Sequence, residues 1–199
     1  DLEEHGKLNI TASSGQPVCW GEPRNCPISM DLESFDLDIL RSLFPENFPL
    51  SGNLFAAGKA QWLGERRFFC QGRARVEEGA LGWKAGAPAQ GQIVAHMEKA
   101  LFNWDWQPDA LLFDLALTLE EGGSLRGEGA LPIGAEWPLT MRVKDPLKGH
   151  LTAGMREWGL LTALLPDLIR ETTGEVEADI DLAGTWESPL LKGHLVLKK

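Results

Sequence analysis

The chain has 199 residues, 43% of them hydrophobic, which is enough for one large or two small domains with a core. Its 29 acidic against 19 basic residues give a formal net charge of -10, which argues against nucleic acid and anionic headgroup surfaces as partners. No stretch approaches the roughly 18 apolar residues of a transmembrane helix, and the opening DLEEHGKLNI lacks a signal-peptide pattern.

The first third of the chain predicts short strands and one helix. Period-two alternation recurs in three groups: Leu8, Ile10 and Ala12; Phe35 and Leu37; and Leu54, Ala56, Ala60 and Trp62. Helical spacing in LDILRSLFP, residues 37–45, predicts a short helix that meets Pro45. Cys19 and Cys26 flank the turn-rich WGEPRN and could close a small disulfide loop, or could be small buried side chains like Cys70.

The middle of the chain predicts more strands of the same kind. The clearest is LLFDLALTLEE, in which five apolar residues from Leu111 to Leu119 share one face and polar residues the other. Weaker alternation occurs at Ala74 and Val76, at Ile93, Ala95 and Met97, and at Leu139, Met141 and Val143. The glycines of GSLRGEGALPIG, residues 123–134, indicate a bent strand or one pressed against bulky groups.

The last part repeats this pattern. WGLLTALLPDLIR, residues 158–170, has helical spacing interrupted at Pro166. GEVEADIDLAG then places Val176, Ala178, Ile180 and Leu182 on one face and four acids on the other. GTWESPLLKGHLVLKK completes a strand, a turn and a strand. The whole chain is therefore expected to be all-β, with about ten to twelve mostly antiparallel strands and two short helices.

An internal repeat is predicted from landmarks that recur in the same order. The helix ending at Pro45 aligns with the one interrupted at Pro166, and Gly52, Trp62 and Gly72 align with Gly174, Trp186 and Gly193, at an offset close to 121 residues. The units span roughly residues 35–80 and 155–199, within one elongated segment.

The sequence offers no convergent catalytic site. The common phosphate-binding, acyl-transfer and zinc-protease motifs are absent, as is a metal-binding pattern of cysteines and histidines. The pairs Asp36 with Asp38 and Asp179 with Asp181 fit a solvated outer face better than acid–base catalysis. Trp104 and Trp106 share a strand face and are either core residues or the rim of an apolar cavity. We therefore expect no enzyme activity, catalytic residue, metal or cofactor.

The sequence resembles the TamB family, which is related to the AsmA-like proteins. The resemblance is carried by GEVEADIDLAGTWESPLLKGHLVLKK, by GLLTALLP with its earlier copy DILRSLFP, and by GSLRGEGALPIG, and it covers most of residues 35–199. It implies a sheet folded into a trough, a β-taco, with an apolar interior and a polar exterior. We expect an internal or C-terminal segment of a longer protein.

The resemblance also implies the setting. Family members are periplasmic and anchored in the inner membrane, here by a segment outside this sequence. They work with an outer-membrane barrel of the TamA type, in outer-membrane biogenesis, protein secretion and phospholipid transport between the two membranes.

An open apolar trough needs a cover, since about ten strands with three or four apolar side chains each would otherwise forfeit tens of kcal/mol at ~1.5 to 3 kcal/mol per buried side chain. Phospholipid acyl chains are the expected cover. The expected lining residues are Leu54, Trp62, Leu111, Phe113, Leu115, Leu117, Leu119, Leu139, Met141, Val143, Val176, Ala178, Ile180, Leu182, Leu195 and Leu197.

Two other interpretations stay open at this point. A periplasmic scaffold or chaperone could present sheet edges to nascent outer-membrane strands by β-augmentation. An all-β enzyme would depend on the tryptophans and the paired carboxylates alone, and is the weakest reading.

Overall fold

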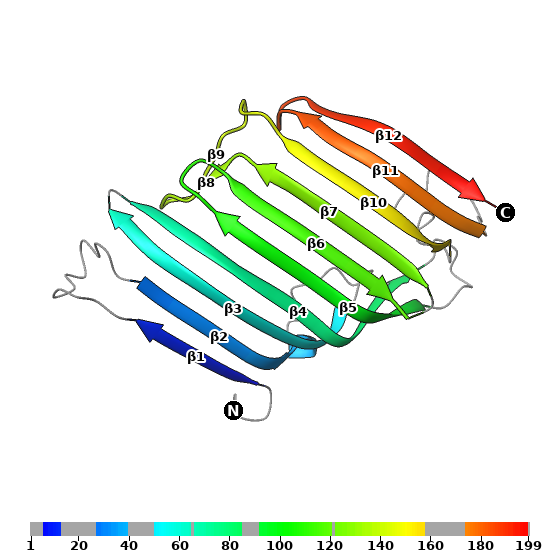
Figure 1. Ribbon diagram of the computed structural model, residues 1–199, viewed down its shortest axis with the longest axis horizontal. Coiled ribbons are helices and arrows are strands. Elements are labelled where there is room, and N and C mark those ends of the chain that lie inside the picture. The colour runs from blue at the N-terminus through cyan, green and yellow to red at the C-terminus, as the bar shows by residue number, and fades with distance from the viewer. Residues whose placement is uncertain are drawn as a thin grey trace.

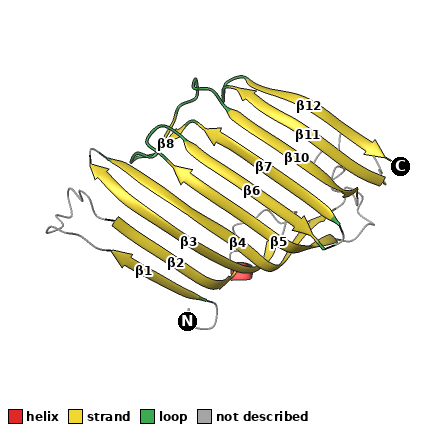
Figure 2. Cartoon of the chain, viewed as in Figure 1, coloured by secondary structure: helices red, strands yellow, loops and turns green. Residues whose placement is uncertain are grey.

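The chain forms one open antiparallel sheet of ten strands and one small hairpin, in a computed structural model that describes residues 6–12, 27–39, 50–64, 66–84, 92–120, 122–157 and 174–198 (Figures 1 and 2). The sheet order is β1-β2-β3-β4-β5-β6-β7-β10-β11-β12, and β8 pairs with β9. The strands of the large sheet are β1 (Lys7–Ala12), β2 (Pro27–Asp36), β3 (Leu50–Gly64), β4 (Arg67–Lys84), β5 (Gln92–Trp106), β6 (Leu111–Leu119), β7 (Gly123–Leu131), β10 (Lys148–Glu157), β11 (Gly174–Gly184) and β12 (Pro189–Lys198). The hairpin is β8 (Ile133–Gly134) and β9 (Thr140–Met141).

The predicted fold class is confirmed: the chain is all-β, in a curved open sheet of mainly antiparallel strands. The two predicted helices lie largely outside the described residues. The described part of the first is a single 3₁₀ turn at residues 37–39, directly after β2. The pair Cys19 and Cys26 also lies outside the described residues.

Pairing register separates the sheet into an apolar face and a polar face. Residues opposite each other on neighbouring antiparallel strands point to the same side. Across β5, β6 and β7, for example, Ala100 lies opposite Leu117, and Leu117 opposite Leu125. One position along, Lys99 lies opposite Thr118, and Thr118 opposite Ser124. The apolar residues of each strand therefore lie beside the apolar residues of the next strand, so that one face of the sheet stays apolar from strand to strand.

Aligned irregularities bend the sheet across four neighbouring strands. The register shifts between Leu32 and Phe35 in β2, around Gly52 in β3, and at residue 98 in β5. In β4, residues 77–78 have no partner on β5. An extra residue kinks a strand and increases its local twist, so bulges placed side by side produce a bend through the whole sheet. We call this line the crease.

The crease leaves no room for a side chain at Gly79. A Cβ on Gly79 would lie 2.4 Å from the Met97 side chain and 2.9 Å from that of Val76. The best-buried apolar cluster of the described residues, Ala95, Met97 and Leu119, lies here. It packs against Leu50 and Leu81 on one side of the crease and against Val76, Ala100 and Leu117 on the other. The bend therefore gathers apolar side chains and makes their face the inner one.

The segment between β7 and β10, residues 132–147, is called the flap and contains β8 and β9. It lies at the end of the sheet where β3 and β5 finish (Figure 1). Leu139, Met141 and Val143 were expected to continue a strand of the sheet, but only Thr140–Met141 is in strand conformation, and it pairs within the flap. The strand taking that place, β10, begins at Lys148 and carries Leu151, Ala153 and Met155 on the apolar face.

Candidate functional site

The apolar face of the large sheet is the candidate site. Following the pairing register from β1 to β12, one row of the face runs Ile10, Met30, Gly58, Gly72, Trp104, Phe113, Gly129, Gly149, Leu182 and Leu191. The next row runs Leu8, Leu32, Ala56, Ala74, Phe102, Leu115, Gly127, Leu151, Ile180 and Gly193. Neither row contains a charged or polar side chain, so the face is a continuous apolar band running across the strands.

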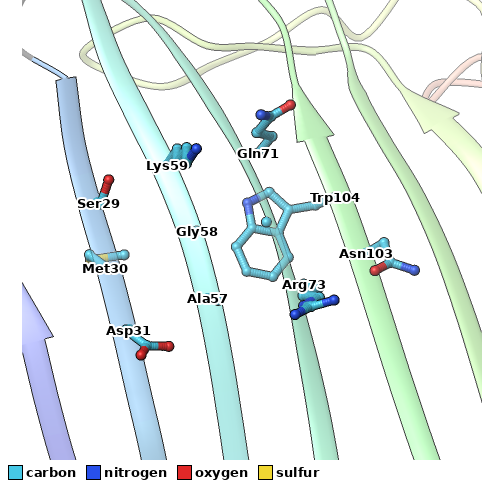
Figure 3. A pocket seen from close by; sticks show the side chains of 11 residues that line it. Ser29, Met30, Asp31, Ala57, Gly58, Lys59, Gln71, Arg73, Asn103 and Trp104 are labelled. Carbon is cyan, nitrogen blue, oxygen red and sulfur yellow. The ribbon is translucent and has the colours of Figure 1, made fainter.

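Aromatic rings fill the places where the band has glycines. A Cβ on Gly72 would lie 2.4 Å from Cζ2 of Trp104, and one on Gly58 3.4 Å from the same atom, so the indole lies across both glycines (Figure 3). The ring of Phe113 lies against Gly129 in the same way, at 2.9 Å. Flat rings laid on bare backbone give the centre of the band a smooth aromatic floor.

The tryptophans of this floor are held by few polar contacts. Trp104 donates its indole N–H to the Sγ of Cys70, at 3.4 Å, and Phe102 stacks on both Trp104 and Phe113 at centroid distances of 5.9 and 6.3 Å. Cys70 is a free thiol. The floor presents hydrocarbon and ring faces to whatever covers it, without a directed donor that would select one ligand.

The band is open at both ends of the sheet. Ile10 on β1 is 59% exposed and Leu191 on β12 is 69% exposed, whereas Met97 at the crease is 4% exposed. Ten strands spaced about 4.8 Å apart make the band ~43 Å long, more than the ~30 Å hydrocarbon thickness of a bilayer.

The band also has two sides. The crease bounds it at one end of the strands, and the flap bounds it at the other. Trp106, on the apolar face, donates its indole N–H to the carbonyl of Ile133 at 2.9 Å, which places β8 against that face. The ring of Phe68 packs between those of Trp62 and Trp106, with centroid distances of 6.0 and 5.2 Å. The result is a groove: floored by the sheet, bordered by crease and flap, and open at β1 and β12.

Thirteen of the sixteen expected lining residues lie on this face: Leu54, Trp62, Leu111, Phe113, Leu115, Leu117, Leu119, Val176, Ala178, Ile180, Leu182, Leu195 and Leu197. The other three, Leu139, Met141 and Val143, lie on the flap, apart from the sheet, and are exposed. Sequence reasoning omitted Phe102, Phe68 and Leu151 from the lining. The alternation of Phe102 with Trp104 and Trp106 could have found the first of these.

The opposite face is polar and carries the charge. Asn103 bonds to Asp114 at 2.9 Å, Arg75 pairs with Glu77 at 2.8 Å, and Lys198 pairs with Glu177 at 2.5 Å. A hollow of about 460 Å³ opens between β2 and β5, and seven of its eleven lining residues, among them Lys59, Arg73 and Asn103, belong to this face (Figure 3).

The acidic pair Asp179 and Asp181 lies on this polar face beside His150. Nδ1 of His150 is 2.9 Å from Asp181 and 3.9 Å from Asp179. The hydrogen bond to Asp181 is the main cause that raises the pKa of His150 above 6.5; the charges of Asp179, Asp181 and Glu128 add to it and desolvation opposes it. All three side chains are substantially exposed, so this is a solvated ion-pair cluster away from the groove.

Within the described ranges, no three His, Cys, Asp or Glu side chains gather closely enough to hold a metal ion. The same ranges contain no helix long and apolar enough to cross a bilayer.

Taken together, the sheet, the crease and the one-sided band define an elongated β-groove protein with an apolar interior and a charged exterior. The family model described as "TamB, N-terminal domain" matches residues 23–197, and the chain therefore belongs to the TamB family. That description places the match in the N-terminal domain, whereas the sequence resemblance suggested an internal or C-terminal segment. No curated protein and no solved structure matches the chain.

Proposed function

We propose that this chain carries phospholipid acyl chains along its groove, as part of a conduit between the inner and outer bacterial membranes. The observation that supports it most is the unbroken apolar register from Ile10 to Leu191, which crosses ten strands without a polar side chain. Transport without a directed polar site suits a cargo whose common feature is hydrocarbon, and it needs no catalytic group.

The magnitude of burial favours this cargo. Each CH₂ removed from water contributes about 0.8 kcal/mol, so a single acyl chain laid on the floor gains on the order of 10 kcal/mol before its ordering cost. The gain hardly changes from one position of the band to the next, because the band is apolar throughout. A cargo held by such a uniform surface can move along it while its headgroup stays in water. The setting would be the periplasm, with the parent protein anchored in the inner membrane and a TamA-type barrel at the outer membrane.

The test uses two neighbouring positions on β6 that point to opposite faces. Leu115→Asp puts a charge on the groove floor, whereas Ala116→Asp puts the same charge on the polar face, opposite Arg126. Binding of a fluorescent fatty acid should fall at least ~tenfold for Leu115→Asp and stay unchanged for Ala116→Asp, since burying an unpaired carboxylate costs several kcal/mol. If both variants bind the fatty acid equally and circular dichroism shows that both are folded, the groove does not carry acyl chains.

A second function is favoured by one observation, the open edges. Within the part of the chain that the structure describes, β1 pairs only with β2 and β12 only with β11, so each presents unpaired backbone groups to which an extended chain can add. In this alternative the chain is a scaffold for outer-membrane protein strands. Hydrogen exchange decides it: a bound amphipathic strand peptide should slow exchange of amides in β1 or β12, and unchanged exchange at both edges would end this alternative.

A further inference from the structure

The flap carries an exposed apolar tip that the groove does not use. Four large apolar residues lie within seven positions of one another: Trp137, Leu139, Met141 and Val143, which are 64%, 51%, 54% and 38% exposed. They alternate with Pro138, Thr140 and Arg142 along the chain. Such a dense set of exposed apolar side chains on a short segment marks an interaction surface.

The tip is mounted on a firmly held base. Ala135 is fully buried, and its backbone accepts from Phe68 N–H at 2.8 Å and donates to the carbonyl of Gln107 at 3.1 Å. Trp137 N–H donates to the carbonyl of Arg66 at 2.8 Å, and Leu147 N–H to that of Gly184 at 2.8 Å. These bonds join the flap to three separate turns of the sheet, so its exposed side chains keep a fixed place beside the groove.

The charge around the tip differs from that of the whole chain. Among the described residues of the flap, of the turns that hold it and of the adjoining starts of β4 and β10, five are basic and four are acidic, a balance of +1 against the chain's -10. The basic ones are Arg66, Arg67, Arg142, Lys144 and Lys148, and the acidic ones are Asp109, Glu136, Asp145 and Glu187. Arg142 pairs with Asp109 at 3.0 Å.

We propose that the tip of the flap inserts into the interfacial layer of a phospholipid bilayer and holds this rim of the groove against the membrane. Indole rings prefer the membrane–water interface, and flanking basic side chains suit lipid phosphates. Insertion of an apolar wedge needs only about 5–10 Å of depth, which a few side chains can fill. A protein partner is less well matched, because four side chains on one small hairpin fall short of the roughly 800 Å² that each partner contributes to a standard interface.

This inference rests on the proposed function, because a membrane-held rim would be where acyl chains enter the groove past Trp106 and Phe68. The rim itself is nearly neutral, with a balance of +1, so the net charge of -10 lies mainly elsewhere on the chain and only this rim has to approach the headgroups.

The test is flotation of the full chain with phosphatidylcholine vesicles and with vesicles that also contain phosphatidylglycerol. Leu139→Ser with Met141→Ser should lower the bound fraction roughly tenfold, and Trp137→Ala, which keeps the backbone bond to Arg66, should lower it in the same direction. The matched control is Leu112→Ser with Val94→Ser, two aliphatic residues on the polar face that are 38% and 44% exposed, and it should bind as the unaltered chain does. The unaltered chain should float with both kinds of vesicle.

Two results would overturn the proposal: no flotation of the unaltered chain with either vesicle, which would leave the tip for a protein partner, or equal flotation of flap and control variants. Fatty-acid binding in the absence of vesicles separates this from the groove's function. The flap variants should keep fatty-acid binding and lose flotation, whereas Leu115→Asp should lose fatty-acid binding and keep flotation. A chain that floats but binds no fatty acid would overturn the groove's function and leave the docking of the flap in place.

Discussion

The indole of Trp104 lies directly on the backbone of Gly72, so closely that a Cβ at residue 72 would sit 2.4 Å from the ring. Trp104 and Gly72 are register partners on β5 and β4, and Gly58 continues the same row on β3. The glycines thus make room for a ring that could not otherwise lie flat, and the ring in turn covers backbone that would otherwise be bare. The groove's smooth floor depends on this pairing.

Gly72→Ala should destabilise the chain by about 1–3 kcal/mol, because the added methyl group meets both the Trp104 ring and the Ala57 carbonyl, at 2.6 Å. For a chain of this size that corresponds to a fall of several degrees in Tm. The control is Gly154→Ala, since nothing lies within 4 Å of a Cβ there. It should leave Tm unchanged or slightly raised, because alanine restricts the unfolded chain more than glycine does. Thermal unfolding followed by circular dichroism measures both variants, and an unperturbed Gly72→Ala would show that the ring does not rest on the backbone.

Trp106→Phe should loosen the flap without disturbing the floor. It removes the indole N–H that donates to the Ile133 carbonyl, a hydrogen bond whose net contribution is about 1 kcal/mol. Amide exchange at Phe68 and Ala135, whose hydrogen bonds hold the flap, should become faster. Trp104→Phe is the comparison, because the one indole hydrogen bond that it removes goes to Cys70 and not to the flap, so those two amides should stay protected. Unchanged exchange in Trp106→Phe would mean that the flap is held by its other contacts alone.

The cluster of His150 with Asp181 should make stability depend on pH in a definite direction. The pKa of His150 is raised above 6.5 in the folded chain, so the folded state binds this proton more tightly than the unfolded one. The resulting stabilisation is fully present below pH 6.5 and is lost as the pH rises through the folded pKa. The drop in Tm caused by His150→Gln should therefore be larger at acidic than at alkaline pH. Asp181→Asn should bring the pKa of His150 down in an NMR titration; an unaltered titration would disprove the assignment of the shift to Asp181.

Gly79→Leu should disrupt the crease, because its side chain would overlap those of Met97 and Val76. The expected outcome is a loss of several kcal/mol and a rise in binding of a hydrophobic dye, as Ala95, Met97 and Leu119 become exposed. Ala80→Leu, the next residue on β4, is the comparison, since it lies on the opposite face and should be tolerated better. If both variants unfold alike, the position of the bend does not depend on close packing at Gly79.

Sequence alone predicted the strands that have a strong period of two. Leu111 to Leu119 and Val176 to Leu182 become β6 and β11, because each has one wet and one apolar face. The glycines of residues 123–131 were expected to press against bulky groups, and Gly129 meets the ring of Phe113 while Gly127 meets Leu115 and Leu151. The alternation of apolar and polar residues was sufficient to predict a strand wherever the apolar residues of that strand are the ones that become buried.

The remainder depended on partners distant in sequence. The crease needs bulges on four strands to align. Two of these bulges have a positive φ at Ser34 and Glu78, and neither residue type indicates such a backbone conformation in the sequence. The Leu139–Val143 alternation resembles a strand, but the bonds from Phe68, Gln107 and Arg66 hold the flap across the end of the sheet instead. The internal repeat stays a prediction; both of its hairpins do place glycines with positive φ at matching points, Gly52 and Gly64 against Gly174 and Gly184.

The most direct measurement places a photo-crosslinking amino acid at Ile180, on the groove floor, and separately at Asp181, on the polar face of the same strand. After illumination of the full-length protein in cells, mass spectrometry should find phospholipid attached at residue 180 and none at residue 181. Lipid adducts at both positions alike, or at neither while the protein remains folded, would contradict the claim that acyl chains travel on the apolar face.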